Sequence, residues 1–177
     1  PDCKDKISVM QNISSPVLIT KQANETVDLP IAPLSLVSLG HIMRRKGTDF
    51  SIDAAKILQK KGVEFKWMLV GKVVEKDLIR RIEQEGLADC FVVLGIRSNP
   101  YPYIKAADIY VHPSRFEGKS IALDEAKILC KPIVVTNFST VNDQFEDREN
   151  ASICEMNGGA LADAIIELAT HKELRQS

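Results

Sequence analysis

Two carboxylates, Glu117 and Glu125, stand with seven residues between them in the stretch 112–126, HPSRFEGKSIALDEA. The apolar run at residues 108–111, just before this stretch, predicts a buried strand. Glu117 would then fall in the loop after the strand, and Glu125 in the helix that follows. Ligands of open α/β sheets bind beyond the carboxyl ends of the strands, where the N–H groups of a helix N-terminus suit an anion. The stretch therefore predicts a site for a phosphate-containing ligand.

Glycine and polar residues follow four predicted strands. They are Gly40-His41, Gly71-Lys72, Gly95-Ile96-Arg97 and His112-Pro113-Ser114. A single glycine often does no more than end a strand, but in a parallel sheet all these ends share one edge. Because Lys46, Lys72 and Arg97 also fall near that edge, we predict a phosphate-binding crevice there. His112 is interpreted as a hydrogen-bonded strand-end histidine, with a crevice-facing side chain as the alternative.

The composition excludes several classes of protein. A chain of 177 residues with 45% hydrophobic residues can form one substantial domain, and its net charge of −1 gives no reason to expect a nucleic-acid partner. The four cysteines include no Cys-x-x-Cys pair, so neither a zinc site nor a thioredoxin-like motif is indicated. Reduced cysteines and the lack of a long apolar run favour a cytoplasmic setting. The chain opens at Pro1 with the character of mid-protein sequence, and we expect a fragment.

From residue 34 onward, apolar runs alternate with segments of helical periodicity. Strands are predicted near 34–39, 65–70, 90–94, 108–112, 133–136 and 151–154, with helices near 48–61, 75–85, 103–107, 120–130 and from 158 onward. Strands that are apolar throughout, separated by helices, are typical of a parallel sheet covered on both faces. We predict an α/β fold with a Rossmann-like, doubly wound parallel sheet of about six strands. Neither G-x-G-x-x-G nor a P-loop is present, which argues against NAD, FAD and P-loop nucleotide binding.

The domain is expected to span residues 34–177, and residues 1–33 are interpreted as a partial linker. Pro16 and other prolines interrupt regular structure in the linker, where residues 17–20 are expected to pair locally.

The helix near 48–61 carries sequence signals at both ends. Thr48 or Asp49 is expected to cap its N-terminus, and Gly62 stands where a C′ glycine is common.

These motifs together resemble a known family. The residues that carry the resemblance are Ser38-Leu39-Gly40 with Arg45-Lys46-Gly47, Leu69-Val70-Gly71, Val93-Leu94-Gly95, Ala106 to Val111, Pro113-Ser114-x-x-Glu117-Gly118, Asp124-Glu125-Ala126 and Lys131-Pro132-Ile133-Val134. Over residues 34 to about 170, the chain resembles the C-terminal, donor-binding domain of family-four retaining glycosyltransferases, which have the GT-B fold. It is similar to the enzymes that build capsular and other surface polysaccharides.

The resemblance implies roles for three charged residues. Glu125 would accept hydrogen bonds from the ribose hydroxyls of a sugar nucleotide, because a carboxylate can receive both donors of a diol. Glu117 would lie near the donor sugar and its anomeric carbon, and Lys46 would neutralise the diphosphate. The family usually has an arginine directly after Gly40, where this chain has His41. Diphosphate binding is therefore expected to be weaker unless Arg44 or Arg45 substitutes; the alternative is that both lie in a solvated basic loop.

Backbone groups are expected to complete the site. Gly118, Lys119, Ser120 and Ile121 would present N–H groups at the helix N-terminus, and Gly40, His41 and Arg45 would lie along the diphosphate. Ile96 and Arg97 would line the base, while Tyr101 and Tyr103 are expected to be packing residues. No Asp-x-Asp motif is present, so the donor, a UDP-sugar or GDP-sugar, is expected to bind without a metal cofactor.

The resemblance thus implies retaining transfer of a hexose to a glycan or lipid-linked acceptor. The acceptor site would belong to an N-terminal domain absent from this sequence, so this chain alone would be inactive, and the full-length protein could associate peripherally with the membrane. Two alternatives remain open: a stand-alone nucleotide-binding module, and a sugar-nucleotide epimerase of the same fold.

Overall fold

The computed structural model describes residues 14–30 and 32–171 and contains a 6-stranded parallel sheet. The strands are β1 (Ser35–Leu39), β2 (Lys66–Val70), β3 (Phe91–Gly95), β4 (Ile109–His112), β5 (Ile133–Thr136) and β6 (Ser152–Cys154). The helices are α1 (Pro16–Gln22), α2 (Thr48–Lys60), α3 (Lys76–Gln84), α4 (Tyr101–Ala106), α5 (Ile121–Ile128) and α6 (Gly158–Thr170), with short 3-10 helices η2 (Arg44–Lys46) and η3 (Val141–Asp143). Residues 1–13 and 31 of the predicted linker, and 172–177 of the predicted domain, lie outside the described residues.

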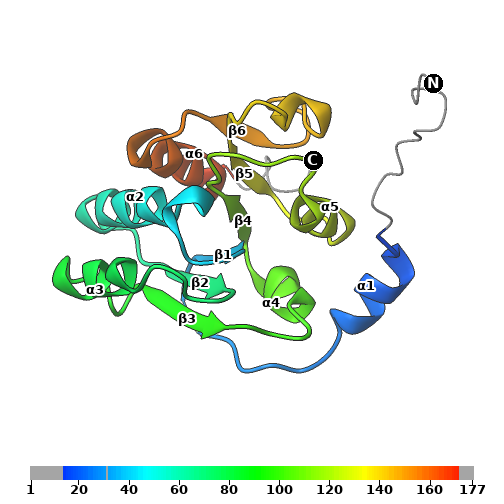
Figure 1. The fold of residues 1–177 in the computed structure, drawn as a ribbon, viewed down its shortest axis with the longest axis horizontal. Coiled ribbons are helices and arrows are strands. Elements are labelled where there is room, and N and C mark those ends of the chain that lie inside the picture. Colours follow the sequence, from blue (N-terminus) through cyan, green and yellow to red (C-terminus); the bar gives the residue numbers. More distant parts are fainter. Residues whose placement is uncertain (1–13, 31, 172–177) are drawn as a thin grey trace, which may run out of the picture.

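Helices cover both faces of the sheet. Figure 1 shows α2, α3 and α6 on one side and α1, α4 and α5 on the other. Successive strand residues point to opposite faces, so Leu36 and Trp67 pack in the first layer while Val37 and Met68 pack in the second. Because both faces are buried, the strands are apolar at nearly every position. This confirms the predicted doubly wound, Rossmann-like fold.

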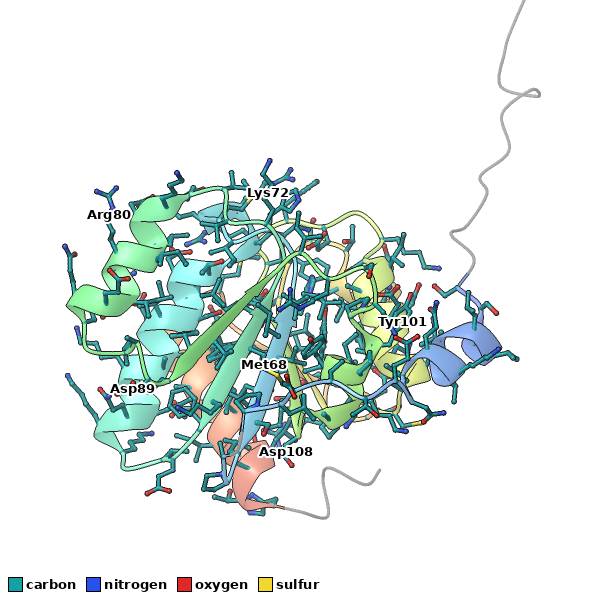
Figure 2. The ribbon with its side chains drawn as sticks, turned by 90° about the horizontal axis from the view of Figure 1, so that it is seen from below. Met68, Lys72, Arg80, Asp89, Tyr101 and Asp108 are labelled. Carbon is teal, nitrogen blue, oxygen red and sulfur yellow. The ribbon has the colours of Figure 1, made fainter. Side chains whose placement is uncertain are left out.

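The strand order β3-β2-β1-β4-β5-β6 reverses between β1 and β4. The chain therefore leaves these two neighbouring strands in opposite directions, which opens a crevice at their carboxyl ends. Figure 2 shows the polarity of the sheet, with Lys72, which follows β2, at one end and Asp108, which precedes β4, at the other. The candidate site residues lie at the end marked by Lys72.

The expectation of extended chain at residues 17–20 is wrong, because these residues form part of helix α1. The Ser15 side chain caps the helix by accepting from the Leu18 N–H, and Pro16 occupies its first position. Proline is well suited to that position, since its missing N–H would have no intrahelical partner there. Ile19 is buried, and the helix packs against α4 and α5.

The predicted N-cap of α2 is also wrong. Gly47 occupies the cap position and makes no side-chain cap hydrogen bond, while the Thr48 hydroxyl accepts from the Met43 N–H. The C-terminal prediction is confirmed, because Gly62 follows the helix with a φ of 74°, in the left-handed region.

Two glycines allow the loops at the carboxyl edge to approach each other closely. A Cβ on Gly71 would lie 2.0 Å from the carbonyl oxygen of Gly40, and one on Gly47 would lie 1.7 Å from that of Pro113. Both glycines have positive φ, at 151° and 73°. The segment after β1 is therefore packed directly against the segments after β2 and β4.

Candidate functional site

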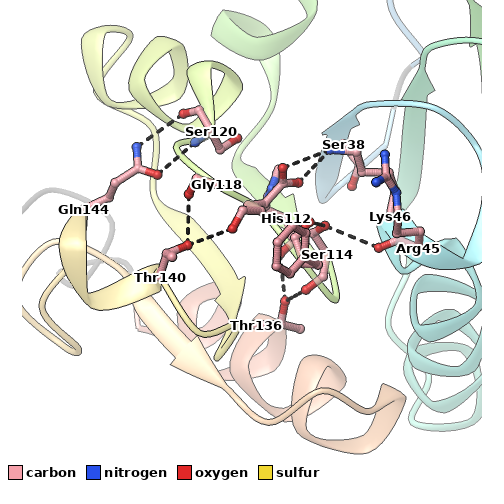
Figure 3. Close-up of polar contacts among 12 residues, drawn as sticks. Ser38, Arg45, Lys46, His112, Ser114, Gly118, Ser120, Thr136, Thr140 and Gln144 are labelled. Carbon is pink, nitrogen blue, oxygen red and sulfur yellow. Dashed lines mark hydrogen bonds and ion pairs between the residues drawn. The ribbon is translucent and has the colours of Figure 1, made fainter. Parts of the chain in front are cut away.

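Glu117 lies at the centre of a charged cluster at the carboxyl edge of β1 and β4. The Lys46 ammonium donates to its two carboxylate oxygens at 2.7 and 3.0 Å, and Nε2 of His112 lies 3.0 Å from Oε1 (Figure 3). An ionised carboxylate only accepts, so Nε2 of His112 carries the proton in this contact. The cluster joins the loop after β1, the end of β4 and the loop that follows it.

The charge of Glu117 is stabilised by this cluster. Burial alone would raise its pKa, but the hydrogen bonds from His112 and Lys46 outweigh burial and lower the pKa to about 2. The side chain is therefore an anion throughout the physiological range, and it can accept hydrogen bonds from a ligand hydroxyl.

Arg115 fixes the distance between the two loops that carry Lys46 and Glu117. Its guanidinium donates to both carboxylate oxygens of Asp49 at 2.7 Å and lies 3.7 Å from the ring centroid of Phe50. Its backbone N–H donates to the carbonyl oxygen of Arg45 at 3.1 Å. A two-pronged contact of this kind sets orientation as well as distance.

Glu125 lies apart from the charged cluster and has its own partner. The Tyr101 hydroxyl, at the start of α4, donates to its Oε1 at 2.9 Å. The pKa of Glu125 is raised above its ordinary value, chiefly by burial. The Tyr101 hydrogen bond lowers this pKa, whereas the charge of neighbouring Asp124 raises it. The carboxylate is only partly buried, and the single bond to Tyr101 leaves it able to accept further donors.

The N-terminus of α5 is arranged differently from the sequence prediction. The Ser120 N–H donates to Oε1 of Gln144 at 3.0 Å. This N–H group therefore already has a partner, whereas the sequence predicts that it is available to a phosphate. The Gln144 amide also donates to the Ser120 carbonyl oxygen, and the Thr140 hydroxyl contacts the carbonyl oxygens of Glu117 and Gly118 (Figure 3). The segment after β5 thus holds the loop that carries Glu117.

The remaining predicted residues lie around the same edge. A pocket between the ends of β1 and β4 is lined by Gly40, His41, Lys46 and His112, among others. The Arg45 side chain is exposed, whereas Arg44 pairs with Glu75 and Asp77 near the start of α3.

The base-side and helix residues are mostly exposed. Ile96 is 71% exposed, and Arg97 places Nε 3.3 Å from the Tyr103 hydroxyl. Gly118 and Ile121 are exposed, and the Lys119 ammonium lies 3.9 Å from Asp124. These residues lie on the loops around the same edge of the sheet.

The sequence does not show which side chains form hydrogen bonds with Glu117 and Glu125. His112 fits both interpretations that the sequence left open, since it is hydrogen-bonded at the end of its strand and also faces the crevice, where it lines the pocket and contacts Glu117. The sequence predicts a packing role for Tyr101 and no contact for Gln144. A polar side chain at the end of a predicted strand was the signal for His112, whereas Tyr101 and Gln144 act on residues 24 positions away and carried no local signal.

Residues 25–177 match the family model described as glycosyl transferases group 1. This chain belongs to that family. Among its relatives, the putative colanic acid biosynthesis glycosyltransferase WcaL of Escherichia coli K12 is 30% identical over 156 residues, which cover 81% of this chain and 38% of WcaL. The alpha-D-kanosaminyltransferase of Streptomyces kanamyceticus is 28% identical over 142 residues, covering 78% and 37%. The chain thus spans less than two-fifths of the length of either relative.

Solved structures of glycosyltransferases share the fold. The C-terminal domain of LpcC, a group 1 protein from Francisella tularensis, has a TM-score of 0.70 and 25% identity, covering 81% of this chain and 78% of that one. HepE of Anabaena, solved in complex with UDP, has a TM-score of 0.74 and 21% identity, covering 92% and 46%. The predicted identity as the C-terminal half of a GT-B fold is confirmed.

Two further observations describe this glycosyltransferase domain. Within residues 14–30 and 32–171, no helix has the length and apolar character needed to cross a membrane. The same residues contain no group of three or more His, Cys, Asp or Glu side chains placed to hold a metal ion.

Proposed function

We propose that this domain binds the nucleoside-diphosphate sugar donor of a retaining hexosyltransferase at the carboxyl edge of β1 and β4. The observation that carries the proposal is the contact between Lys46 and Glu117, which joins a cation and a buried anion at the point where the strand order reverses. Ligands of open α/β sheets bind at that point. Membership of the glycosyl transferases group 1 family favours a transferase over an epimerase or a module that only binds nucleotides.

Lys46 is proposed to lie against the diphosphate. In the transfer step, the bond between the anomeric carbon and the diphosphate oxygen breaks, and the electron pair leaves with the nucleoside diphosphate. A lysine ammonium stabilises the negative charge that develops on that leaving group. The acceptor hydroxyl oxygen bonds to the same face of the anomeric carbon, and its proton passes to the departing phosphate oxygen.

Glu117 is proposed to hold the donor sugar. Because its pKa is about 2, its carboxylate is ionised at neutral pH and accepts a hydrogen bond from a sugar hydroxyl. Its negative charge also stabilises positive charge that develops on the sugar ring. Glu125 is proposed to accept both ribose hydroxyls, and the exposed loop at Ile96 and Arg97 to lie beside the base.

The positive charge of Lys46, supported by the exposed Arg45, is proposed to stabilise the diphosphate in place of the divalent cation that metal-dependent transferases use. UDP is the first nucleotide to test, since HepE was solved in complex with UDP. The relative named for colanic acid biosynthesis, WcaL, supports a glycan or lipid-linked acceptor.

The acceptor site is proposed to lie outside this sequence, in the additional length that the relatives have. The 177-residue chain would then bind the donor nucleotide weakly and transfer sugar poorly or not at all. Turnover of a UDP-sugar by this chain alone, at a rate typical of transferases, would contradict that part of the proposal.

Calorimetric titration with UDP, GDP and ADP tests the donor site. We expect at least one of them to bind, and to bind equally well in the presence of a chelator. Glu125→Ala should weaken that binding about ten- to a hundredfold, since a hydrogen bond to a charged group contributes about 1.5–3 kcal/mol. Glu149→Ala, on an exposed loop away from the site, is the matched control and should bind as the parent does. Equal affinity of Glu125→Ala and the parent for every nucleotide would show that the ribose assignment is wrong.

A further inference from the structure

Tyr101 is the hydrogen-bonding partner of Glu125 and comes from a different helix. Its hydroxyl donates to Oε1 of Glu125 at 2.9 Å, across the contact between α4 and α5. One hydrogen bond occupies one of the roughly four acceptor positions of a carboxylate. The remaining positions are enough for two ribose hydroxyls, so Tyr101 restricts the rotation of Glu125 without using up its capacity to bind.

The backbone of Tyr101 is linked to helix α1 through Asn99. Its N–H donates to Oδ1 of Asn99 at 3.2 Å, and the Asn99 amide donates to the carbonyl oxygen of Gln22 at 2.9 Å. Gln22 ends α1, which packs against both α4 and α5. A chain of contacts therefore leads from α1 through Asn99 to the ring that holds Glu125.

The charges around Glu125 make this hydrogen bond more important. Two groups lie near the Glu125 carboxylate: the Asp124 carboxylate, next to it on α5, and the hydroxyl of the buried Tyr110 on β4. Neither carries a positive charge that would compensate the negative charge of Glu125. The one charged residue of α1, Lys21, is exposed. Burial and the neighbouring Glu125 raise the pKa of Tyr101 to about 12, so its hydroxyl remains a donor at every pH of interest.

We propose that Tyr101 is a positioning residue for ribose recognition, holding the Glu125 carboxylate in the orientation that accepts the ribose diol. This inference rests on the proposed donor-binding function. It assigns a task to a tyrosine that makes no contact with the Glu117 cluster among the described residues. Its consequence is specific: loss of the hydroxyl should affect only the interaction energy that depends on the ribose hydroxyls.

The test compares Tyr101→Phe with the parent chain, using UDP and 2′,3′-dideoxy-UDP as the two probes. For UDP we expect the variant to bind about three- to tenfold more weakly, a smaller effect than that of Glu125→Ala because the lost hydrogen bond orients the carboxylate and does not itself contact the nucleotide. For the dideoxy nucleotide, the two proteins should bind equally, because the groups that Glu125 would accept from are absent. Thermal unfolding of both proteins checks that the variant is folded.

Tyr103→Phe is the matched control, since Tyr103 lies in the same helix and its hydroxyl contacts Arg97 instead. A second readout is the pH dependence of UDP binding. Removal of the Tyr101 hydrogen bond raises the pKa of Glu125, so the loss of affinity on acidification should begin at higher pH in Tyr101→Phe. The titration of UDP itself is common to all the proteins, and Tyr103→Phe should retain the parent profile.

Three results would overturn the inference. The first is an unchanged UDP affinity in Tyr101→Phe. The second is an equal loss of affinity for UDP and for its dideoxy analogue in Tyr101→Phe, which would mean that Tyr101 acts on another part of the nucleotide or on folding. The third is a shift of the acid limb in Tyr103→Phe as large as that in Tyr101→Phe. If the parent binds no nucleoside diphosphate, the proposed function fails and this inference fails with it. Nucleotide binding that is lost in Glu125→Ala but unaffected in Tyr101→Phe would overturn this inference and leave the proposed function standing.

Discussion

Lys46 and Glu117 are 71 positions apart in the chain, yet the Lys46 ammonium contacts both carboxylate oxygens of Glu117, at 2.7 and 3.0 Å. Lys46 comes from the loop after β1, and Glu117 from the loop after β4. The contact therefore spans the two neighbouring strands between which the strand order reverses. Under the proposed function, a diphosphate that enters this edge would meet a cation that Glu117 already holds in place.

Lys46→Met should weaken UDP binding by about tenfold or more, because methionine keeps the apolar stem and removes the charge that faces the diphosphate. Titration calorimetry at neutral pH measures the effect. Lys60→Met, at the far end of α2, is the control and should leave the affinity unchanged. The salt dependence of binding should also become shallower in Lys46→Met alone. Parent-like affinity in Lys46→Met would remove this lysine from the diphosphate site.

The ion pair of Glu117 should make the free energy of unfolding depend on pH in the acidic range. The pKa of Glu117 is about 2 in the folded protein, below its ordinary value of 4.5. A lowered folded-state pKa contributes stability that is fully present above the ordinary value and is lost as the pH falls towards the folded value. Between pH 4.5 and 2, the free energy of unfolding should therefore fall more steeply in the parent than in Glu117→Gln.

Denaturant unfolding at a series of pH values measures both slopes. The other carboxylates titrate alike in the two proteins, so the difference between the slopes isolates Glu117. Parallel curves for the parent and Glu117→Gln would show that the ion pair with Lys46 and His112 does not lower the pKa of Glu117 in solution.

The fold was predictable because its signals are local. Apolar strands, helical stripes and Gly62 report on neighbours within a few residues of one another, and most element boundaries agreed to within one or two residues. The helix α1 differs from the prediction because Ser15 before Pro16 is a helix start signal, whereas prolines in this segment also indicate interrupted structure. A proline ends a helix in its interior but is well tolerated at its first position.

The site was only partly predictable, since its geometry depends on tertiary contacts. Gly47 lies so close to the loop after β4 that a Cβ there would be 1.7 Å from the carbonyl oxygen of Pro113, and this glycine occupies the cap position of α2 instead of Thr48 or Asp49. Gln144 reaches back to the Ser120 N–H, and Tyr101 reaches forward to Glu125, each across 24 positions. No periodicity relates such pairs, so a sequence shows the residue types without showing which of them meet.

Arg44 and Arg45 should respond differently to substitution, although they are adjacent. Arg44 is engaged by Glu75 and Asp77, whereas the Arg45 side chain is exposed beside the loop of Lys46. We expect Arg45→Ala to weaken UDP binding several-fold, because the Arg45 guanidinium pairs with no carboxylate within residues 14–30 and 32–171 and can reach the diphosphate. Arg44→Ala should bind UDP as the parent does. The same titration distinguishes them, and an effect confined to Arg44→Ala would reverse the assignment.

Gly47→Ala should strongly destabilise the protein, because this glycine has a φ of 73° and a Cβ there would lie 1.7 Å from the carbonyl oxygen of Pro113. Gly62→Ala separates the two causes. Gly62 has a φ of 74°, but a Cβ there would meet nothing within 4 Å, so its substitution costs only the left-handed conformation, about 1–2 kcal/mol. We expect Gly47→Ala to cost at least about 2 kcal/mol more than Gly62→Ala in denaturant unfolding, since the clash is with backbone and cannot be relieved by a rotamer change. Equal losses in the two variants would mean that the loops after β1 and β4 can separate at little cost, and that the contact between Lys46 and Glu117 does not depend on their close packing.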